Sequence, residues 1–207
     1  MSVPAWLARN VFRLQEAALH RPTFSVLEEL ERTQWLSRED MLDYQTGHLN
    51  VLLQTALAHS PWHAARLHAA GLAETVQAGA VLPGDLARLP TMDKRDAREN
   101  VEQLVWRGVP GGVFPYTTGG SSGEPLIFHF GRARQAADAA GRLRARCWWG
   151  VAPGEREVYL WGAPVELSRT DRIKTLRDRL VNQLLLNAFA MSPACMDGYL
   201  EAMQAWN

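Results

Sequence analysis

The feature that most constrains this chain is a polar segment, residues 117–125, placed between two apolar runs. Its sequence is Thr-Thr-Gly-Gly-Ser-Ser-Gly-Glu-Pro, and residues 113–116 and 126–130 flank it with mainly apolar and aromatic side chains. Flexible linkers usually separate polar segments, whereas a polar loop between apolar runs is typical of two strands joined by a functional turn. We therefore expect residues 117–125 to form a solvent-accessible loop between two strands.

The composition of this loop favours the binding of phosphate. Glycines allow the backbone to adopt positive φ and to approach a ligand closely. Consecutive N–H groups in such a turn form a concave anion site, and hydroxyl groups add further donors. No lysine follows the glycines, so the nucleotide-binding pattern G-x-x-x-x-G-K-[ST] is excluded. A purely structural turn and a plain linker remain the alternative interpretations.

The loop resembles the phosphate-binding loop of the adenylate-forming enzymes, the superfamily of acyl-CoA synthetases. The pattern of that loop is [ST]-[SG]-G-[ST]-[ST]-G-x-P, and residues 118–125 fit it position by position. Residues 89–96, 59–63 and 33–37 resemble segments of the phenylacetate–CoA ligase and capsule-biosynthesis ligase branch. Two positions depart from common members: Gly119 replaces a serine, and Glu124 replaces a lysine that would place a positive charge near the phosphates.

The resemblance implies an ATP-dependent ligase. A carboxylic acid would be activated as an acyl-adenylate and passed to a thiol, usually that of coenzyme A, with Mg²⁺ sharing the phosphate charge. The loop would hold the β- and γ-phosphates, so that the departing pyrophosphate is positioned and stabilised. The implied ATP-binding residues are the hydroxyl donors Thr117, Thr118, Ser121 and Ser122, the glycines Gly119, Gly120 and Gly123, and Glu124 with Pro125 at the exit.

The resemblance also implies that this chain is the N-terminal portion of a longer ligase. The ribose-binding aspartate and the catalytic lysine of the family match no segment here, so catalytic residues are expected beyond Asn207 and the chain alone is expected to be inactive. The rest of the ligase would be supplied in cis or as a separate chain. Within the present sequence, Trp161 and Gly162 follow an expected strand and are candidates for the edge of the carboxylate-binding pocket, although a Trp at a strand end also serves commonly in a core.

Composition excludes some functions. Lys and Arg number 22, as do Asp and Glu, so the formal net charge is zero. This balance argues against general binding to nucleic acid or to an acidic membrane surface. Five arginines between positions 132 and 146 would spread around a helix, which favours a solvated surface over a phosphate-binding strip.

The remaining reactive side chains carry no recognisable site. Cys147 and Cys195 have no metal-ligand spacing, and no apolar run is long enough to span a bilayer. We interpret both as reduced thiols in a cytoplasmic protein. No metal site is expected from the spacing of the histidines. His129 lies beside the loop and is interpreted as an ordinary strand residue.

The chain is expected to belong to the α/β class, as part of the large domain of an adenylate-forming enzyme. Residues 1–107 form a mainly helical region, and residues 108–207 form an α/β region with strands alternating with helices. Helices are expected over 3–19, from a cap at Ser37 to about 60, from 61 to about 71, and over 93–104, 132–149, 169–186 and from 192 onward, with a loop over 85–90 and strands over 126–130, 158–161 and 187–191.

Three functions are compatible with the sequence. The first is the adenylate-forming ligase. The second is a non-catalytic domain of a split or degenerate ligase that binds a nucleotide or a partner subunit. The third is a structural helical domain in which the Gly/Ser segment is only a turn. Binding of nucleotide would separate the third from the other two.

Overall fold

The structure is a computed structural model that describes residues 3–117, 125–162 and 169–206. It has a mixed α/β architecture, 62% helical with small sheets, which confirms the predicted class at that level. Contacts divide the chain into two compact units, Glu28–Ala137 on the one hand and Met1–Leu27 with Asp138–Asn207 on the other. No helix in the described ranges combines the length and apolar character needed to cross a membrane.

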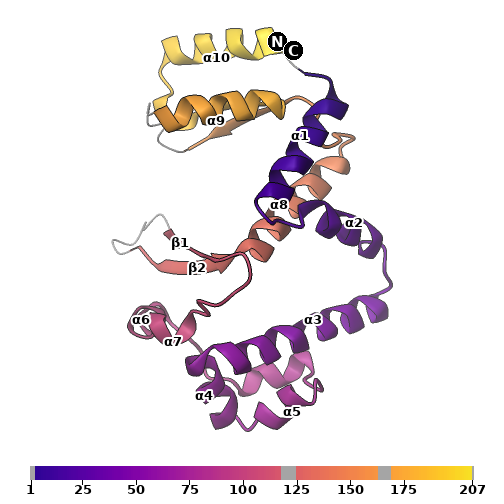
Figure 1. Cartoon of the computed structure of the whole chain (residues 1–207), viewed down its shortest axis with the longest axis vertical. Coiled ribbons are helices and arrows are strands. Elements are labelled where there is room, and N and C mark those ends of the chain that lie inside the picture. Colours follow the sequence, from indigo (N-terminus) through magenta and orange to yellow (C-terminus); the bar gives the residue numbers. More distant parts are fainter. Residues whose placement is uncertain (1–2, 118–124, 163–168, 207) are drawn as a thin grey trace. The chain divides into compact units, whose positions relative to one another are not determined.

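The Glu28–Ala137 unit begins within α2 (Thr23–Thr33), a helix that the sequence analysis did not anticipate. It continues with α3 (Arg38–His59), α4 (Pro61–Ala69) and α5 (Ala73–Gln77) (Figure 1). As expected, the Ser37 hydroxyl caps α3 and α4 starts at Pro61. The Ser60 hydroxyl caps α4, which was not predicted from the sequence. These helices enclose an apolar core of Leu53, Leu67, Leu72, Val76 and Val81.

A buried amide ties the end of this core to α3. The Asn50 Oδ1 accepts from the Val81 N–H at 2.9 Å, and its Nδ2 donates to the Val81 carbonyl at 3.0 Å and to the Thr46 carbonyl at 2.9 Å. The amide thereby replaces a strand as the partner of the Val81 backbone, which would otherwise be buried without hydrogen bonds.

Two expectations in the next segment were wrong. The expected loop over 85–90 contains a 3₁₀ helix, η1 (Pro83–Arg88), started by its proline. The expected helix over 93–104 is two helices, α6 (Lys94–Glu99) and α7 (Val101–Leu104). They separate at Asn100, whose side chain donates to the Asp96 carbonyl at 2.9 Å. A side chain that competes in this way for a main-chain partner favours an interruption of the helix.

The unit ends with the strands that flank the glycine-rich segment. β1 (Val113–Thr117) pairs antiparallel with β2 (Ile127–Gly131), followed by α8 (Arg132–Cys147). The expected strand over 126–130 is thus confirmed with a shift of one residue. α8 starts where expected and ends two residues early, before Gly150, which has φ of +77°.

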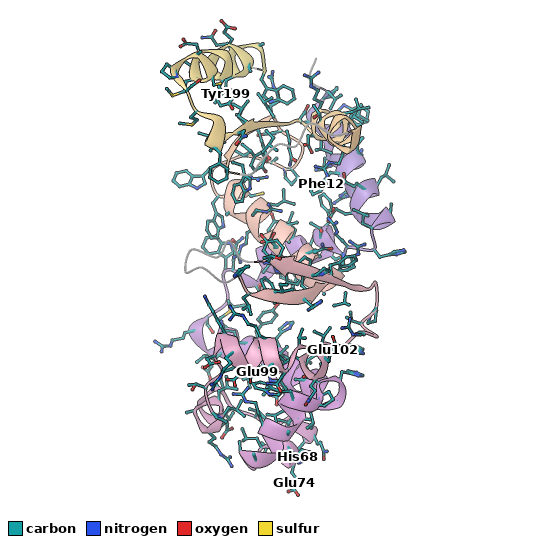
Figure 2. The ribbon with its side chains drawn as sticks, turned by 90° about the vertical axis from the view of Figure 1, so that its left-hand side faces the viewer. Phe12, His68, Glu74, Glu99, Glu102 and Tyr199 are labelled. Carbon is teal, nitrogen blue, oxygen red and sulfur yellow. The ribbon has the colours of Figure 1, made fainter. Side chains whose placement is uncertain are left out.

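The other unit contains α1 (Ala5–Ala18), the later part of α8, and a two-stranded parallel sheet. The sheet pairs β3 (Glu157–Trp161) with β4 (Gln183–Asn187), which are joined through α9 (Arg169–Leu180). After β4 come η2 (Ala188–Ala190) and α10 (Pro193–Trp206). The Tyr199 hydroxyl of α10 donates to the Asn187 carbonyl at 2.9 Å (Figure 2).

The expected helix over 169–186 and strand over 187–191 were wrong in their boundary. α9 ends at Leu180, and the strand occupies 183–187 because Asn182 adopts a left-handed backbone conformation with φ of +58°. Its buried side chain accepts from Val3 N–H at 3.1 Å and donates to the carbonyls of Val3 at 2.9 Å and Gly154 at 2.8 Å. Asparagine is one of the few residues that tolerates this conformation at a helix end.

We expect Asn50→Leu to lower the free energy of unfolding by about 2–4 kcal/mol, because it leaves the N–H and C=O of Val81 buried without partners. Urea denaturation measures the loss, and hydrogen exchange of the Val81 amide localises it. Asn50→Asp retains the acceptor for this amide and should keep more of its protection. The matched variant Asn10→Leu, at an exposed position of α1, should change stability by less than about 0.5 kcal/mol.

Gly154 and Gly150 provide a second comparison. A Cβ on Gly154 would lie 2.3 Å from the Ala5 carbonyl oxygen and 2.7 Å from the Arg9 nitrogen, whereas a Cβ on Gly150 meets nothing within 4 Å. Both glycines have positive φ, so alanine at either position introduces backbone strain. Gly154→Ala should destabilise the chain by about 1–3 kcal/mol more than Gly150→Ala, the usual range for overpacking. Equal losses in thermal melting of the two variants would contradict the close packing of Gly154 on α1.

Candidate functional site

The candidate phosphate site is the connection between β1 and β2. Their register runs from Val113 opposite Gly131 to Thr117 opposite Ile127, so the chain between the paired ends is residues 118–126. Thr117, at the end of β1, and Pro125 are both exposed. The other implied ATP-binding residues lie outside the described part of the chain: Thr118, Gly119, Gly120, Ser121, Ser122, Gly123 and Glu124.

Aromatic side chains on one face of the two strands stabilise their register. The ring centroids of Tyr116 and Phe128 lie 5.3 Å apart, and those of Tyr116 and Phe130 lie 5.9 Å apart. Phe114 and Phe130 extend the contact, at 6.3 Å. Cross-strand aromatic pairs each contribute up to about 1 kcal/mol to sheet pairing. They therefore hold the paired ends at Thr117 and Ile127, from which the candidate loop extends.

Two arginines from the start of α8 contact the same aromatic face. The Arg132 guanidinium lies 4.1 Å from the centre of the Phe114 ring, and that of Arg134 lies 5.2 Å from the centre of the Phe130 ring. Phe130 is three residues from Ile127, or about 10 Å along the strand. These cations add a positive potential to the paired strands, an arrangement that helix periodicity did not reveal.

The expectation of a solvated arginine surface was only partly correct. Arg134 and Arg142 are exposed, but Arg132, Arg144 and Arg146 are half-buried. Arg144 lies over the Trp148 ring at 5.3 Å, and Arg142 approaches Asp138 at 3.6 Å. Most of these arginines therefore make separate local contacts. The planar guanidinium group suits such contacts, because it can stack on a ring or pair with a carboxylate.

The candidate substrate residues Trp161 and Gly162 belong to the other unit. Trp161 ends β3 opposite Asn187 of β4, and it is 63% exposed. Phe189 follows at the same end of the sheet, 74% exposed, and a Cβ on Gly162 would lie 3.0 Å from its ring. Trp161 and Gly162 thus lie at the carboxyl ends of two parallel strands, where open α/β sheets commonly bind ligands.

At the opposite end of β3, Glu157 forms a half-buried polar cluster. Its carboxylate forms an ion pair with Arg146, accepts from the Tyr159 hydroxyl at 2.6 Å and lies 3.5 Å from the Gln183 amide nitrogen. Burial raises the pKa of Glu157 above its usual value, and the charge of Arg146 opposes this rise without cancelling it. Because every partner is part of the local fold, this cluster is structural.

The chain was compared with protein-family models, curated protein sequences and solved structures, and none of them matches it. Among the residues that the structure describes, no group of three or more His, Cys, Asp or Glu side chains could hold a metal ion. Function must therefore be argued from the hairpin, its sequence and the two compact units.

We expect Glu157 to make stability fall as pH rises. Its raised pKa in the folded state means that the unfolded chain loses this proton first, so the contribution is fully present below pH 4.5 and is lost as pH rises through the folded-state pKa. Denaturation over this pH range should show that Glu157→Gln removes this part of the decline. The control is Glu155→Gln at an exposed position. If the stability of the wild type relative to Glu157→Gln increased with pH, the expectation would be contradicted.

Proposed function

We propose that this chain supplies the phosphate-binding loop of an ATP-dependent adenylate-forming ligase that activates a carboxylic acid and transfers it to a thiol. The observation that carries the proposal is the antiparallel pairing of β1 with β2, because it places the two ends of the Gly/Ser segment side by side. The resemblance of this segment to the superfamily loop supplies the chemistry. The finer assignment, to the phenylacetate–CoA ligase branch with coenzyme A as the thiol, is part of the same proposal.

The donor set of the loop suits a polyphosphate. Four hydroxyl groups, at Thr117, Thr118, Ser121 and Ser122, accompany three glycines, which have no side chain to keep a ligand away from the backbone. Hydroxyl and amide donors bind phosphate oxygens with charge-assisted hydrogen bonds. Thr117 is exposed at the paired end of β1, so its hydroxyl is accessible to a ligand at the tip.

The loop would act in the first half of the reaction. A carboxylate oxygen attacks the α-phosphorus of ATP, the bond to the bridging oxygen breaks, and pyrophosphate leaves with the electron pair. Donors on the β- and γ-phosphates stabilise the charge that develops on this leaving group. In the second half, the deprotonated thiol attacks the acyl carbon and AMP leaves, and no polyphosphate remains for the loop to hold.

The ligase would also need Mg²⁺, a pocket for the carboxylic acid and further catalytic residues. Mg²⁺ would be carried largely by the phosphates of ATP, as it commonly is at such sites. Trp161 and Gly162 would border the carboxylate-binding pocket. The ribose-binding and catalytic lysine residues, which match nothing in this sequence, would come from other polypeptide in cis or from a separate chain. As an ATP-dependent ligase, the protein would act in the cytoplasm.

Calorimetric titration with Mg–ATP, Mg–pyrophosphate and AMP tests whether the loop binds phosphate. We expect Ser121→Ala combined with Ser122→Ala to weaken the binding of ATP and pyrophosphate by at least about tenfold, because each charge-assisted hydrogen bond contributes about 1.5–3 kcal/mol. Affinity for AMP, which lacks the β- and γ-phosphates, should change little. The matched control is Ser25→Ala, at an exposed position of α2.

An equal loss of affinity for ATP and AMP, or no loss of affinity for either, would show that the loop does not bind the β- and γ-phosphates. A different result would favour the non-catalytic domain. In that case the chain would bind pyrophosphate, but it would support no carboxylate-dependent release of pyrophosphate when combined with the remaining ligase components.

Single-turnover kinetics of the assembled ligase provide a stricter test. The same double variant should slow the formation of acyl-adenylate far more than the transfer of a preformed acyl-adenylate to the thiol, since interactions with departed phosphates can lower only the first barrier. The effects of neighbouring hydroxyls need not add. Thermal melting checks folding, and equal slowing of both steps would contradict the assigned role.

A further inference from the structure

A cavity of about 370 Å³ lies beside β2 in the Glu28–Ala137 unit. All six residues from Leu126 to Gly131 line it, whereas among the described residues of β1 only Val113 does so. Residues of α4, α6 and α7 and of the segment after α7 form the rest of the lining. Figure 1 shows α6 and α7 next to the hairpin. The cavity thus lies between β2 and these helices.

The lining places this cavity along the outer edge of β2. Successive side chains of a strand point to opposite faces, so a cavity over one face would be lined by every second residue. Phe128 and Phe130 belong to the set that contacts the rings of β1. Ile127 and His129 belong to the other set, and both sets line the cavity. Gly131 has no side chain and contributes its main chain, as a strand edge does.

Pro115 in β1 indicates which main-chain groups of β2 face this edge. A proline has no N–H, and inside a sheet its nitrogen points away from the paired strand. His129 is opposite Pro115 in the register, and opposed residues of an antiparallel pair direct their main-chain groups either both toward each other or both away. The N–H and C=O of His129 therefore face away from β1, as do the N–H groups of Ile127 and Gly131, two positions to either side.

These outward groups are available to another strand. Within the part of the chain that the structure describes, no hydrogen bond outside the β1–β2 pairing involves the N–H of Ile127, His129 or Gly131. Unpaired main-chain groups at a sheet edge are a template for strand pairing. Pro115 removes a donor from the outer edge of β1, so β2 has the more complete edge.

We propose that this cavity binds an extended, uncharged and mainly apolar peptide segment of another protein, which adds a third strand to the outer edge of β2. Main-chain groups of β2 supply the hydrogen bonds, and the apolar walls hold the side chains, the two components of peptide recognition by strand addition. The described lining residues include no Lys, Arg, Asp or Glu, and a charge without a partner would be costly to bury there.

The dimensions of the cavity favour a single strand over a second copy of this chain. An apolar cavity of roughly 150 Å³ accommodates benzene, so about 370 Å³ has space for two or three apolar side chains. The β2 edge of a second copy would carry its own α6 and α7, which line the same cavity, so the two edges would not meet. The added strand continues the β1–β2 pairing, and its binding does not depend on the proposed phosphate loop.

Amide NMR of the purified 207-residue chain tests the proposal with a capped pentapeptide in which threonine and valine alternate. We expect the peptide to shift the amide resonances of Ile127, His129 and Gly131 and to slow their hydrogen exchange. The amides of Phe128 and Phe130, which face β1, should change less, because their hydrogen bonds are already made.

Two N-methylated peptides are the matched controls, one with methylated threonine amides and one with methylated valine amides. Alternate N–H groups of a strand point to opposite edges, so only one of these peptides loses the donors that face β2. We expect that peptide to bind about tenfold more weakly or less, while the other retains its affinity. A peptide held only by its side chains would show no such difference.

Variants of His129 separate its main chain from its side chain. His129→Pro removes the outward N–H and should weaken peptide binding by about threefold to tenfold relative to His129→Ala, which retains it. If the proline variant misfolds, Ala97→Phe provides a second test, because a ring in the cavity should abolish binding. Its control is Ala58→Phe, at an exposed position of α3, which should bind as the wild type does.

Several results would overturn the proposal. One is the absence of amide shifts when millimolar peptide is added to the wild-type chain. Others are equal affinities of the two N-methylated peptides, or equal affinities of folded His129→Pro and His129→Ala. Slower exchange of the same amides at higher chain concentration, without peptide, would show that a second copy occupies the edge instead.

Discussion

Each compact unit depends on a buried asparagine amide that acts as the hydrogen-bond partner of a distant main-chain segment. Asn50 satisfies both backbone groups of Val81, and Asn182 does the same for Val3 while also binding the Gly154 carbonyl. An amide carries a donor and an acceptor in fixed geometry, so it can replace a neighbouring strand. These contacts allow irregular segments to be buried against helices, and the core around Leu53 and Val81 relies on one of them.

The β1–β2 hairpin separates two different chemical environments. The paired ends at Thr117 and Ile127 lead into the segment for which phosphate binding is proposed, while β2 lines an apolar cavity together with residues of α6 and α7. Side chains alternate along β2, so that Phe128 and Phe130 pack against the aromatic residues of β1 while His129 lies on the other face. The aromatic contacts across this hairpin hold the two ends from which the proposed phosphate-binding loop extends.

Local signals predicted the parts of the fold that depend on local chemistry. The cap at Ser37, the helix start at Pro61 and the helix ends near Gly71 and Gly150 are such cases, since helix starts and ends depend on neighbouring residues. Prediction failed where long-range contacts decide. The helical pattern continued through residue 186, yet pairing with β3 made residues 183–187 a strand, because tertiary hydrogen bonds override intrinsic propensity.

The sequence alone determined the α/β class and the two strands on either side of the Gly/Ser segment, and it predicts phosphate binding by that segment, because periodicity and composition encode these features locally. Only the tertiary structure decided the surroundings of His129, which lies in β2 with a buried Nδ1 that has no partner in the described residues. It also decided the contacts of Arg132 and Arg134 with the hairpin rings. The physical reason is that a cavity and a cation–π contact join residues from separate elements, whose proximity is fixed by packing.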